Sequence, residues 1–166
     1  MLKSISFSTL LLLMYVFWGC SGTYTVKKES NPITFTAKVG TATAYDIEEK
    51  TRRLLDRYRY EIVRFEKTYD QIYFETQWRY RSPFEDEYEI SVVDARTRII
   101  INARPRTRTY VTGTDLYVIH VRGENQVRLE GSDAWINLPM TDMVMVYLSK
   151  FAENLEMEFR TGIRKY

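Results

Sequence analysis

Cysteine and histidine are almost absent from this chain of 166 residues, which contains one of each, Cys20 and His120. A single cysteine cannot close a disulfide inside the chain, so the core must hold the fold by itself. A lone histidine cannot supply the usual ligands of a zinc site. The chain also lacks a G-x-S-x-G motif, a glycine-rich phosphate loop and paired metal-ligand motifs. We therefore expect no metal, no cofactor and no enzymatic activity, with His120 a half-exposed strand residue.

Neither sign of charge is in excess, because 24 lysine and arginine side chains stand against 22 aspartate and glutamate side chains. This balance gives no reason to expect a nucleic-acid partner. Proline (4) and glycine (7) are scarce, whereas tyrosine (13) and phenylalanine (8) are common. Such a composition favours long strands whose tyrosines lie on half-wetted faces.

The one long apolar run lies near the N-terminus, over residues 10–18, and follows the single cation Lys3. It is too short for a membrane-spanning helix, which needs about 20 apolar residues. A positive start followed by a short apolar run and a small residue is typical of a secretory signal. The run ends at Gly19-Cys20.

This ending resembles the lipobox of bacterial lipoproteins. The resemblance implies a signal peptide over residues 1–19, acyl chains such as palmitate on Cys20, and a tether over residues 20–32. Ser21 stands where inner-membrane retention in enterobacteria uses an aspartate, so the resemblance favours the outer membrane. The alternative is an ordinary signal peptide cleaved nearby, with Cys20 incidental.

Alternation of apolar and polar residues predicts the first elements. Residues 33–39 alternate cleanly and predict a half-buried strand that ends at Gly40. Thr43, with Asp46 three positions later, is typical of a helix cap, and helical spacing continues to about residue 58. Strands are then predicted over residues 60–66 and 72–80. In the second of these, one face is expected to carry Ile72, Phe74, Thr76, Trp78 and Tyr80.

The rest of the chain predicts more strands and a closing helix. Glu85-Asp86-Glu87 is expected in a loop. Strands are predicted over residues 88–93, 97–103, 116–121 and 126–129. A turn is expected at residues 94–96, and Gly123-Glu124-Asn125 is expected to form a hairpin turn. Thr141 is predicted to cap a helix that presents a broad apolar stripe as far as Phe159.

This order of elements predicts a single α+β domain over residues 33–166. We expect an antiparallel sheet of about five to seven strands. An N-terminal helix and a long C-terminal helix should cover one face of this sheet, in a helix-grip-like arrangement.

Two short segments support a family resemblance. The chain resembles the helix-grip domains of the NlpB-type lipoprotein in Tyr60-Glu61-Ile62-Val63 and in the strand from Ile72 to Trp78. The residues that carry the resemblance are Ile62, Thr76 and Trp78. That protein accompanies the outer-membrane β-barrel assembly machine. The lipoprotein plug of the lipopolysaccharide transport barrel, also two helices on an antiparallel sheet, is a second family that the chain resembles. Either resemblance implies a non-catalytic accessory at the outer membrane.

Two groups of side chains are candidate sites. Five arginines could form a patch for an anionic ligand or a membrane surface, unless neighbouring acids neutralise them across strands. They are Arg96, Arg98, Arg104, Arg106 and Arg108. A helix that grips a curved sheet can also leave an apolar pocket, which would be lined here by Trp78, Trp135, Tyr147 and Phe151, unless these residues form a filled core.

Two functional hypotheses follow. The first is a membrane-anchored envelope lipoprotein that acts as an accessory or scaffold of an outer-membrane assembly or transport complex and binds an envelope protein. The second is a binding module for a lipid or small apolar ligand held between the sheet and the C-terminal helix. The first predicts a dry core and an exposed docking surface, and the second an enclosed pocket.

Overall fold

The computed structural model describes residues 31–106 and 116–162. The expected signal peptide, Cys20, most of the tether and Arg108 lie outside these described residues. Within the described part, no helix is both long enough and apolar enough to cross a membrane.

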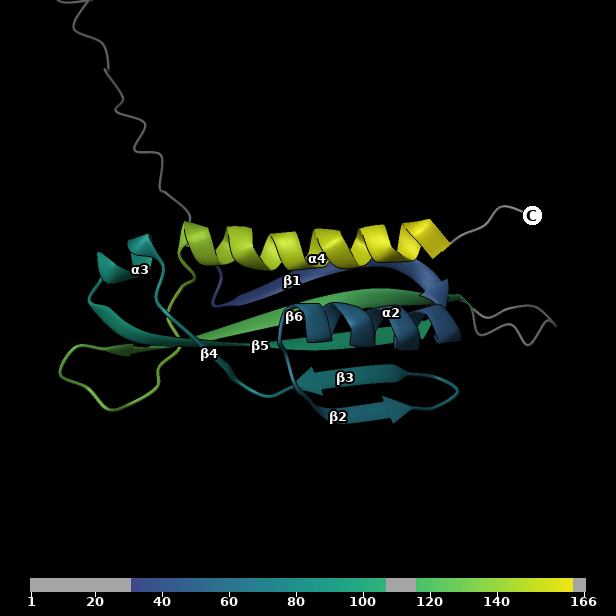
Figure 1. Ribbon diagram of the computed structural model, residues 1–166, viewed down its shortest axis with the longest axis horizontal. Helices are drawn as coiled ribbons and strands as arrows, with labels where there is room; N and C mark the ends of the chain where they lie inside the picture. The colour runs from purple at the N-terminus through teal and green to yellow at the C-terminus, as the bar shows by residue number, and fades with distance from the viewer. Residues whose placement is uncertain (1–30, 107–115, 163–166) are drawn as a thin grey trace, which may run out of the picture.

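The strands form one antiparallel sheet, as predicted (Figure 1). They are β1 (Thr34–Thr43), β2 (Ile62–Lys67), β3 (Ile72–Thr76), β4 (Arg79–Arg81), β5 (Val92–Pro105) and β6 (Leu116–Leu129). The order across the six-stranded sheet is β1-β6-β5-β3-β2, and β4 pairs with β5 beside β3. β1 and β2 are therefore the two ends of this order, and β4 is a short strand paired with β5 alone among the described strands.

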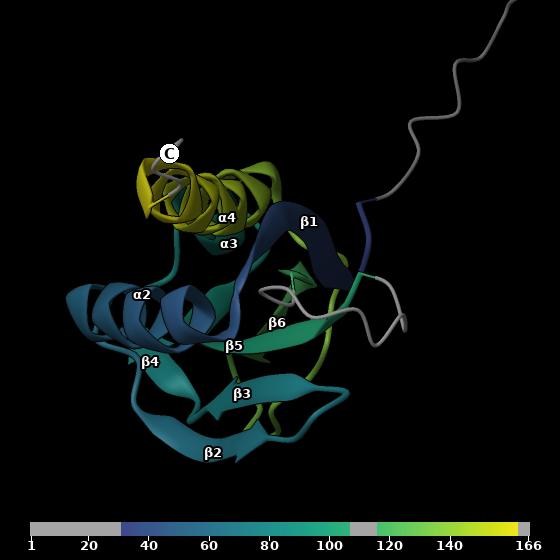
Figure 2. The ribbon, with the colours of Figure 1, turned by 90° about the vertical axis from the view of Figure 1, so that its right-hand side faces the viewer.

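Helices cover one face of this sheet. They are α2 (Ala44–Arg57), the one-turn α3 (Glu85–Tyr88) and the long α4 (Asp142–Gly162). The sheet curls around α2 and α4, which lie side by side (Figure 2). Their inward faces are fully buried at positions such as Leu54, Leu148 and Phe151. The α+β class and the coverage of one face by two helices are confirmed.

The expected hairpin turn at Gly123 is wrong, because this glycine lies in the middle of β6. Gly123 is opposite Phe35 of β1 and Ile99 of β5 in register. A Cβ atom placed on Gly123 would lie 2.8 Å from both terminal methyl groups of Leu148 on α4. The glycine is therefore needed where the helix approaches the sheet, and not for a turn.

The other expected breaks in the strands are also wrong. Residues 94–96 continue β5, which is 14 residues long, and Tyr88 belongs to α3 together with the acidic residues expected in a loop. β1 does not end at Gly40 but continues to Thr43. Gly40 has φ 111° and lies at a shift in register, so it forms a β-bulge.

The first helix cap is confirmed and the second is corrected. The Thr43 hydroxyl accepts a hydrogen bond from Asp46 N at 3.2 Å at the start of α2. At the start of α4, the Thr141 hydroxyl is buried and has no hydrogen-bond partner among the described residues. Instead, the carboxylate of Asp86 on α3 accepts a hydrogen bond from Met143 N at 2.8 Å. A distant acid therefore caps α4, which sequence spacing cannot reveal.

Candidate functional site

One inserted residue between β3 and β4 creates the most distinctive surface of the protein. Glu75 lies opposite Ile100, and Arg79 lies opposite Thr97. From Glu75 to Arg79 the chain advances four residues, whereas the paired segment of β5, from Ile100 to Thr97, covers three. At this bulge the Thr76 hydroxyl accepts a hydrogen bond from Ile99 N at 3.0 Å. An extra residue exchanges the two faces of a strand, so the side chains beyond it reverse direction.

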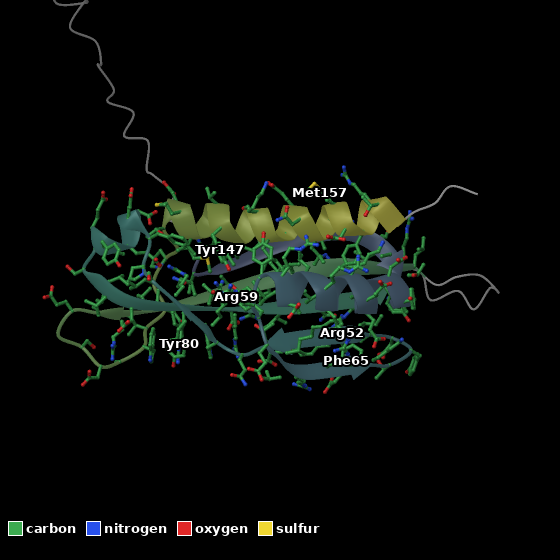
Figure 3. All side chains as sticks on the ribbon, in the orientation of Figure 1. Arg52, Arg59, Phe65, Tyr80, Tyr147 and Met157 are labelled. Carbon is green, nitrogen blue, oxygen red and sulfur yellow. The ribbon has the colours of Figure 1, made fainter. Side chains whose placement is uncertain are left out.

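Trp78 and Tyr80 therefore do not share the core face of Ile72 and Phe74, as the alternation predicted. They lie on the face of the sheet that the helices leave open, and Tyr80 is 66% exposed. Figure 3 shows Tyr80 on the side of the sheet opposite to Tyr147, which points from α4 toward the sheet. Thr76 is the last residue for which the predicted face is correct.

Arginine and tryptophan side chains interleave on this open face. The guanidinium carbon of Arg96 lies 4.9 Å from the ring centre of Trp78 and 4.3 Å from that of Trp135. Arg98 adds a second cation at 4.8 Å from Trp78. Tyr80 packs edge-on against Trp135 with ring centres 5.7 Å apart. We call these five side chains the arginine–tryptophan stack. Each cation–π contact of this kind contributes about 0.5–1 kcal/mol at an exposed site.

The stack contains one arginine with acidic partners and one without. Arg98 donates to Glu75 at 2.9 Å and to Glu124 at 2.6 Å, so its charge is neutralised across strands. Among the residues that the structure describes, Arg96 donates only to the Gln126 side-chain oxygen, through Nε at 2.9 Å and Nη2 at 2.6 Å. A guanidinium has five N–H donors, so Arg96 keeps unused donors and has no carboxylate partner among the described residues.

The structure separates the five predicted arginines. Arg96 and Arg98 belong to the stack, whereas Arg104 and Arg106 are exposed near the end of β5 and beyond it. Six residues of extended chain separate Arg98 from Arg104, which corresponds to about 20 Å. Arg108 lies outside the described residues. The first two arginines thus form a site with aromatic neighbours, and the next two do not share it.

The four aromatic residues of the expected pocket do not come together either. Trp78 and Trp135 lie on the open face, whereas Tyr147 and Phe151 lie on the sheet-facing side of α4. Phe151 is completely buried and packs edge-on against Tyr60 with ring centres 6.1 Å apart. The space between the sheet and this part of α4 is therefore filled by side chains.

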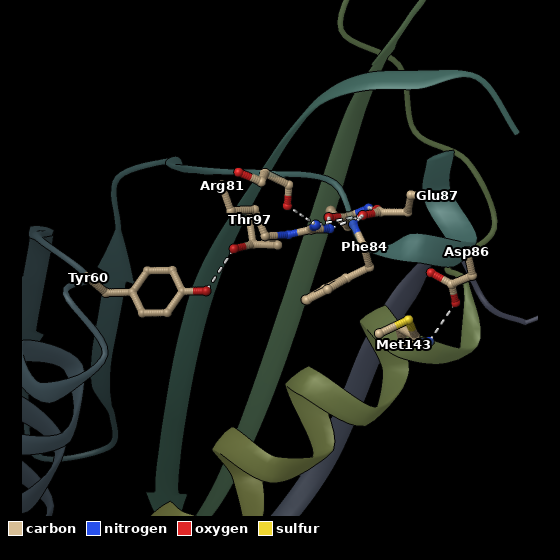
Figure 4. A network of polar contacts seen from close by, with 9 residues as sticks. Tyr60, Arg81, Phe84, Asp86, Glu87, Thr97 and Met143 are labelled. Carbon is tan, nitrogen blue, oxygen red and sulfur yellow. Dashed lines mark hydrogen bonds and ion pairs between the residues drawn. The ribbon is translucent and has the colours of Figure 1, made fainter. Parts of the chain in front are cut away.

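The same bulge turns Arg79 and Arg81 toward the helices, where both donate hydrogen bonds to side chains of the helices. Figure 4 shows the contacts of Arg81. Arg81 donates to both carboxylate oxygens of Glu87, at 2.6 and 2.8 Å, and its Nη2 also donates to the Asn125 side-chain oxygen at 2.9 Å. The side chains of Arg81 and Glu87 are 7% and 2% exposed. This ion pair ties α3 to the sheet, and α3 in turn caps α4 through Asp86.

A second buried contact joins the sheet to the middle of α4. Tyr60 Oη lies 2.8 Å from the Thr97 hydroxyl and 3.0 Å from Tyr147 Oη. Arg79 donates to Tyr147 Oη at 2.8 Å. Burial raises the pKa of Tyr147 well above its usual range, and the neighbouring Tyr60 raises it further. Tyr147 therefore keeps its proton near neutral pH, and its hydroxyl joins α4 to Tyr60 and Arg79.

His120 lies exposed on the open face of β6, opposite Lys38 and Asn102 in register. Over residues 31–106 and 116–162, no three His, Cys, Asp or Glu side chains are grouped so that they could hold a metal ion. In comparisons with known proteins, no family model and no curated sequence matches this chain. The geometry of the open face is therefore the basis of the functional proposal.

Sequence reasoning found part of this site. The sequence suggested that Arg96 and Arg98 belong to one basic patch, although it placed Arg96 in a turn and not in the strand that carries Arg98. The contribution of Tyr80 and Gln126 was missed, because Tyr80 depends on the bulge and Gln126 depends on the register between β5 and β6. Neither feature leaves a local signal in the sequence.

Proposed function

We propose that this protein is an envelope lipoprotein anchored through Cys20, and that its domain is a non-catalytic accessory of an outer-membrane assembly or transport complex. In this proposal the arginine–tryptophan stack binds an acidic segment of a partner protein. The observation that carries the proposal is Arg96, held between two indole rings with donors still unused.

The chemistry of the stack supports a docking role. Tryptophan, tyrosine and arginine are enriched among the interface residues whose truncation costs the most binding energy. Here Arg96 is already oriented by Trp78, Trp135 and Gln126, so a partner carboxylate meets a preorganised donor. Carboxylates accept two parallel hydrogen bonds from a guanidinium, which also fixes their orientation.

The entry point of the chain is compatible with an anchor at Cys20. Pro32 O accepts a hydrogen bond from Met140 N at 3.0 Å, and the Asn31 side chain donates to Asp142 at 2.7 Å. The chain thus enters the domain beside the start of α4 (Figure 1). The residues between Cys20 and this point can extend to about 35–40 Å. A tether of this length leaves the open face accessible.

Site-specific photo-cross-linking tests the proposal. Tyr80, at the rim of the stack, is replaced by p-benzoylphenylalanine in the full chain expressed in its own envelope. Tyr45 on α2, which is 72% exposed, is replaced in the same way as a matched control. Illumination should cross-link position 80 to a discrete envelope protein and leave position 45 without this product. Loss of a central arginine contact costs about 2 kcal/mol or more, so Arg96→Ala should remove the product.

Two results would contradict the proposal. One is the same product from positions 45 and 80, and the other is a product from position 80 that persists in the Arg96→Ala background. The anchor is tested separately by mass spectrometry of the intact protein from native membranes. A chain that starts at Cys20 with added acyl mass supports the anchor, whereas an unmodified N-terminus at another residue contradicts it.

A further inference from the structure

β1 is an edge strand whose outer side has no strand partner among residues 31–106 and 116–162. It pairs with β6 on one side along its ten residues, and the sheet order ends with it. Alternate residues of such a strand point N–H and C=O groups away from the sheet. These groups are spaced to match another extended chain, so an uncovered edge is a template for one more strand.

A groove lies between this edge and α4. It has a volume of about 260 Å³ and is lined by Phe35, Ala37, Lys38, Val39, Ser149, Ala152, Glu153 and Glu156. The lining residues of β1 include the apolar ones that face the helix, and α4 contributes the small side chains of Ser149 and Ala152. Small residues on the helix leave room beside the edge for the side chains of an added strand.

The helix side of this groove is acidic. Glu153 is exposed and makes no ion pair with any described residue. Glu156 pairs with Arg160 one turn later, at 2.6 Å, but Arg160 is 74% exposed, so this pair is weak. An added strand would direct every second side chain toward these two carboxylates.

We propose that the β1 edge and the adjacent flank of α4 form a peptide-binding groove. Its ligand is an extended segment of a partner protein that pairs with β1 as an additional antiparallel or parallel strand and carries lysine or arginine at alternate positions. Backbone hydrogen bonds to β1 hold the segment, and Glu153 and Glu156 select its basic side chains. The groove is separate from the arginine–tryptophan stack, and this proposal holds whether or not the stack binds a partner.

A second copy of the chain fits the groove less well. Lys38 lies near the middle of β1, so a two-fold pairing of two β1 strands brings the two Lys38 side chains near each other. The bulge between Lys38 and Gly40 also interrupts a regular edge. A charged residue and a bulge are the features by which natural edges resist self-association. The part of β1 before Lys38, which includes Phe35 and Ala37 of the groove, remains regular for pairing with a partner strand, and the complementary charge comes from Glu153 and Glu156 on α4.

Binding of a designed peptide tests this proposal on the full mature chain in detergent. The probe is a fluorescent peptide of alternating lysine and threonine, about as long as β1. A matched peptide has the same side chains but carries N-methyl groups at every residue, so that it cannot donate backbone hydrogen bonds to a strand edge on either of its sides. Fluorescence anisotropy should show that the first peptide binds with a dissociation constant below about 1 mM and that the second does not.

Two charge reversals locate the site. Glu153→Lys removes an attraction and adds a repulsion, so it should weaken binding about tenfold. Glu130→Lys changes the net charge equally at an exposed position after β6 and should change binding less than twofold. Hydrogen exchange should show new protection of the amides of β1 and none of β2, the other edge. Trp135→Ala, which disrupts the stack, should leave peptide binding unchanged.

The proposal is overturned by any of four results. These are no binding of the probe, equal binding of the N-methylated peptide, equal effects of the two charge reversals, and protection at β2 instead of β1. Concentration-dependent dimerisation that protects β1 in the absence of peptide would also overturn it, in favour of a second copy as the occupant. None of these results bears on the cross-linking from position 80.

Discussion

The buried ion pair between Arg81 and Glu87 provides the sharpest test of how this fold is held together. Both side chains are nearly inaccessible to solvent, and their two N···O distances are 2.6 and 2.8 Å. Glu87 also accepts a hydrogen bond from Phe84 N at 2.9 Å, and Asn125 contacts both members of the pair. Removal of one partner leaves the other as a buried, unneutralised charge.

Glu87→Leu should therefore destabilise the protein by about 3–5 kcal/mol. The loss is large because, among the described residues, the Arg81 Nε already has no hydrogen-bond partner. Without Glu87 the guanidinium would keep only the Asn125 side chain and the backbone carbonyl of Ser82 from this part of the chain. Domains of this size are stable by about 5–15 kcal/mol in total. Arg81→Met should lower the free energy of unfolding somewhat less, because the Glu87 carboxylate still accepts hydrogen bonds from Phe84 N and the Asn125 side chain.

The double variant Arg81→Met/Glu87→Leu should lose much less free energy of unfolding than the two single variants together, because it leaves no unpaired charge at this buried position. Urea denaturation followed by circular dichroism, with Cys20→Ser to prevent lipidation, measures all four stabilities. A coupling energy of about 2 kcal/mol or more is expected. Additive losses, or single variants that each cost less than about 1 kcal/mol, would refute the assignment of a buried, mutually neutralising pair.

Three further outcomes follow from the packing. Burial raises the pKa of Tyr147, so the protonated Tyr147 hydroxyl stabilises the folded protein fully below about pH 10, and this stabilisation is lost as the pH rises further. On alkaline titration followed by circular dichroism, Tyr147→Phe should therefore lose less stability than the wild type. An identical alkaline loss in the two proteins would contradict this. Gly123→Ala should cost about 1–3 kcal/mol in urea denaturation, because its methyl group meets Leu148, and Leu148→Ala should remove most of this added cost; an additive double variant would argue against the contact. Asp86→Ala should lower the free energy of unfolding by about 1 kcal/mol through loss of a helix cap, whereas Thr141→Ala should change it by less than about 0.5 kcal/mol. A larger loss in Thr141→Ala than in Asp86→Ala would show that Thr141 caps α4, as the sequence predicted.

The sequence predicted the parts of this fold that depend on neighbours a few residues away. The α2 helix begins at Thr43 because a threonine hydroxyl can reach the N–H of Asp46, and this geometry is local. The apolar residues of α4 repeat with helical spacing, so the sequence also predicted which face of this helix is buried. The class of the fold followed from the order of such elements.

The sequence misled where a residue serves a distant contact. Gly123 resembles a turn residue, but its small size is required by Leu148 on a helix that comes 25 positions later. Residues 94–96 resemble a turn because Asp94 and Arg96 are charged and Ala95 is small, yet they lie within β5, where Ala95 is buried and Arg96 faces the open side of the sheet. Composition cannot distinguish a turn from a strand that is half exposed.

The sequence by itself determined the class of the fold and its two covering helices, and it suggested a common basic patch for Arg96 and Arg98. Only the tertiary structure placed both arginines on one face of β5 and decided what they meet. One extra residue between Glu75 and Arg79 turns Trp78 and Tyr80 to the open face and turns Arg81 into the interior. Strand register is set by pairing between segments far apart in the chain, and a shift of one residue exchanges every side chain between core and solvent.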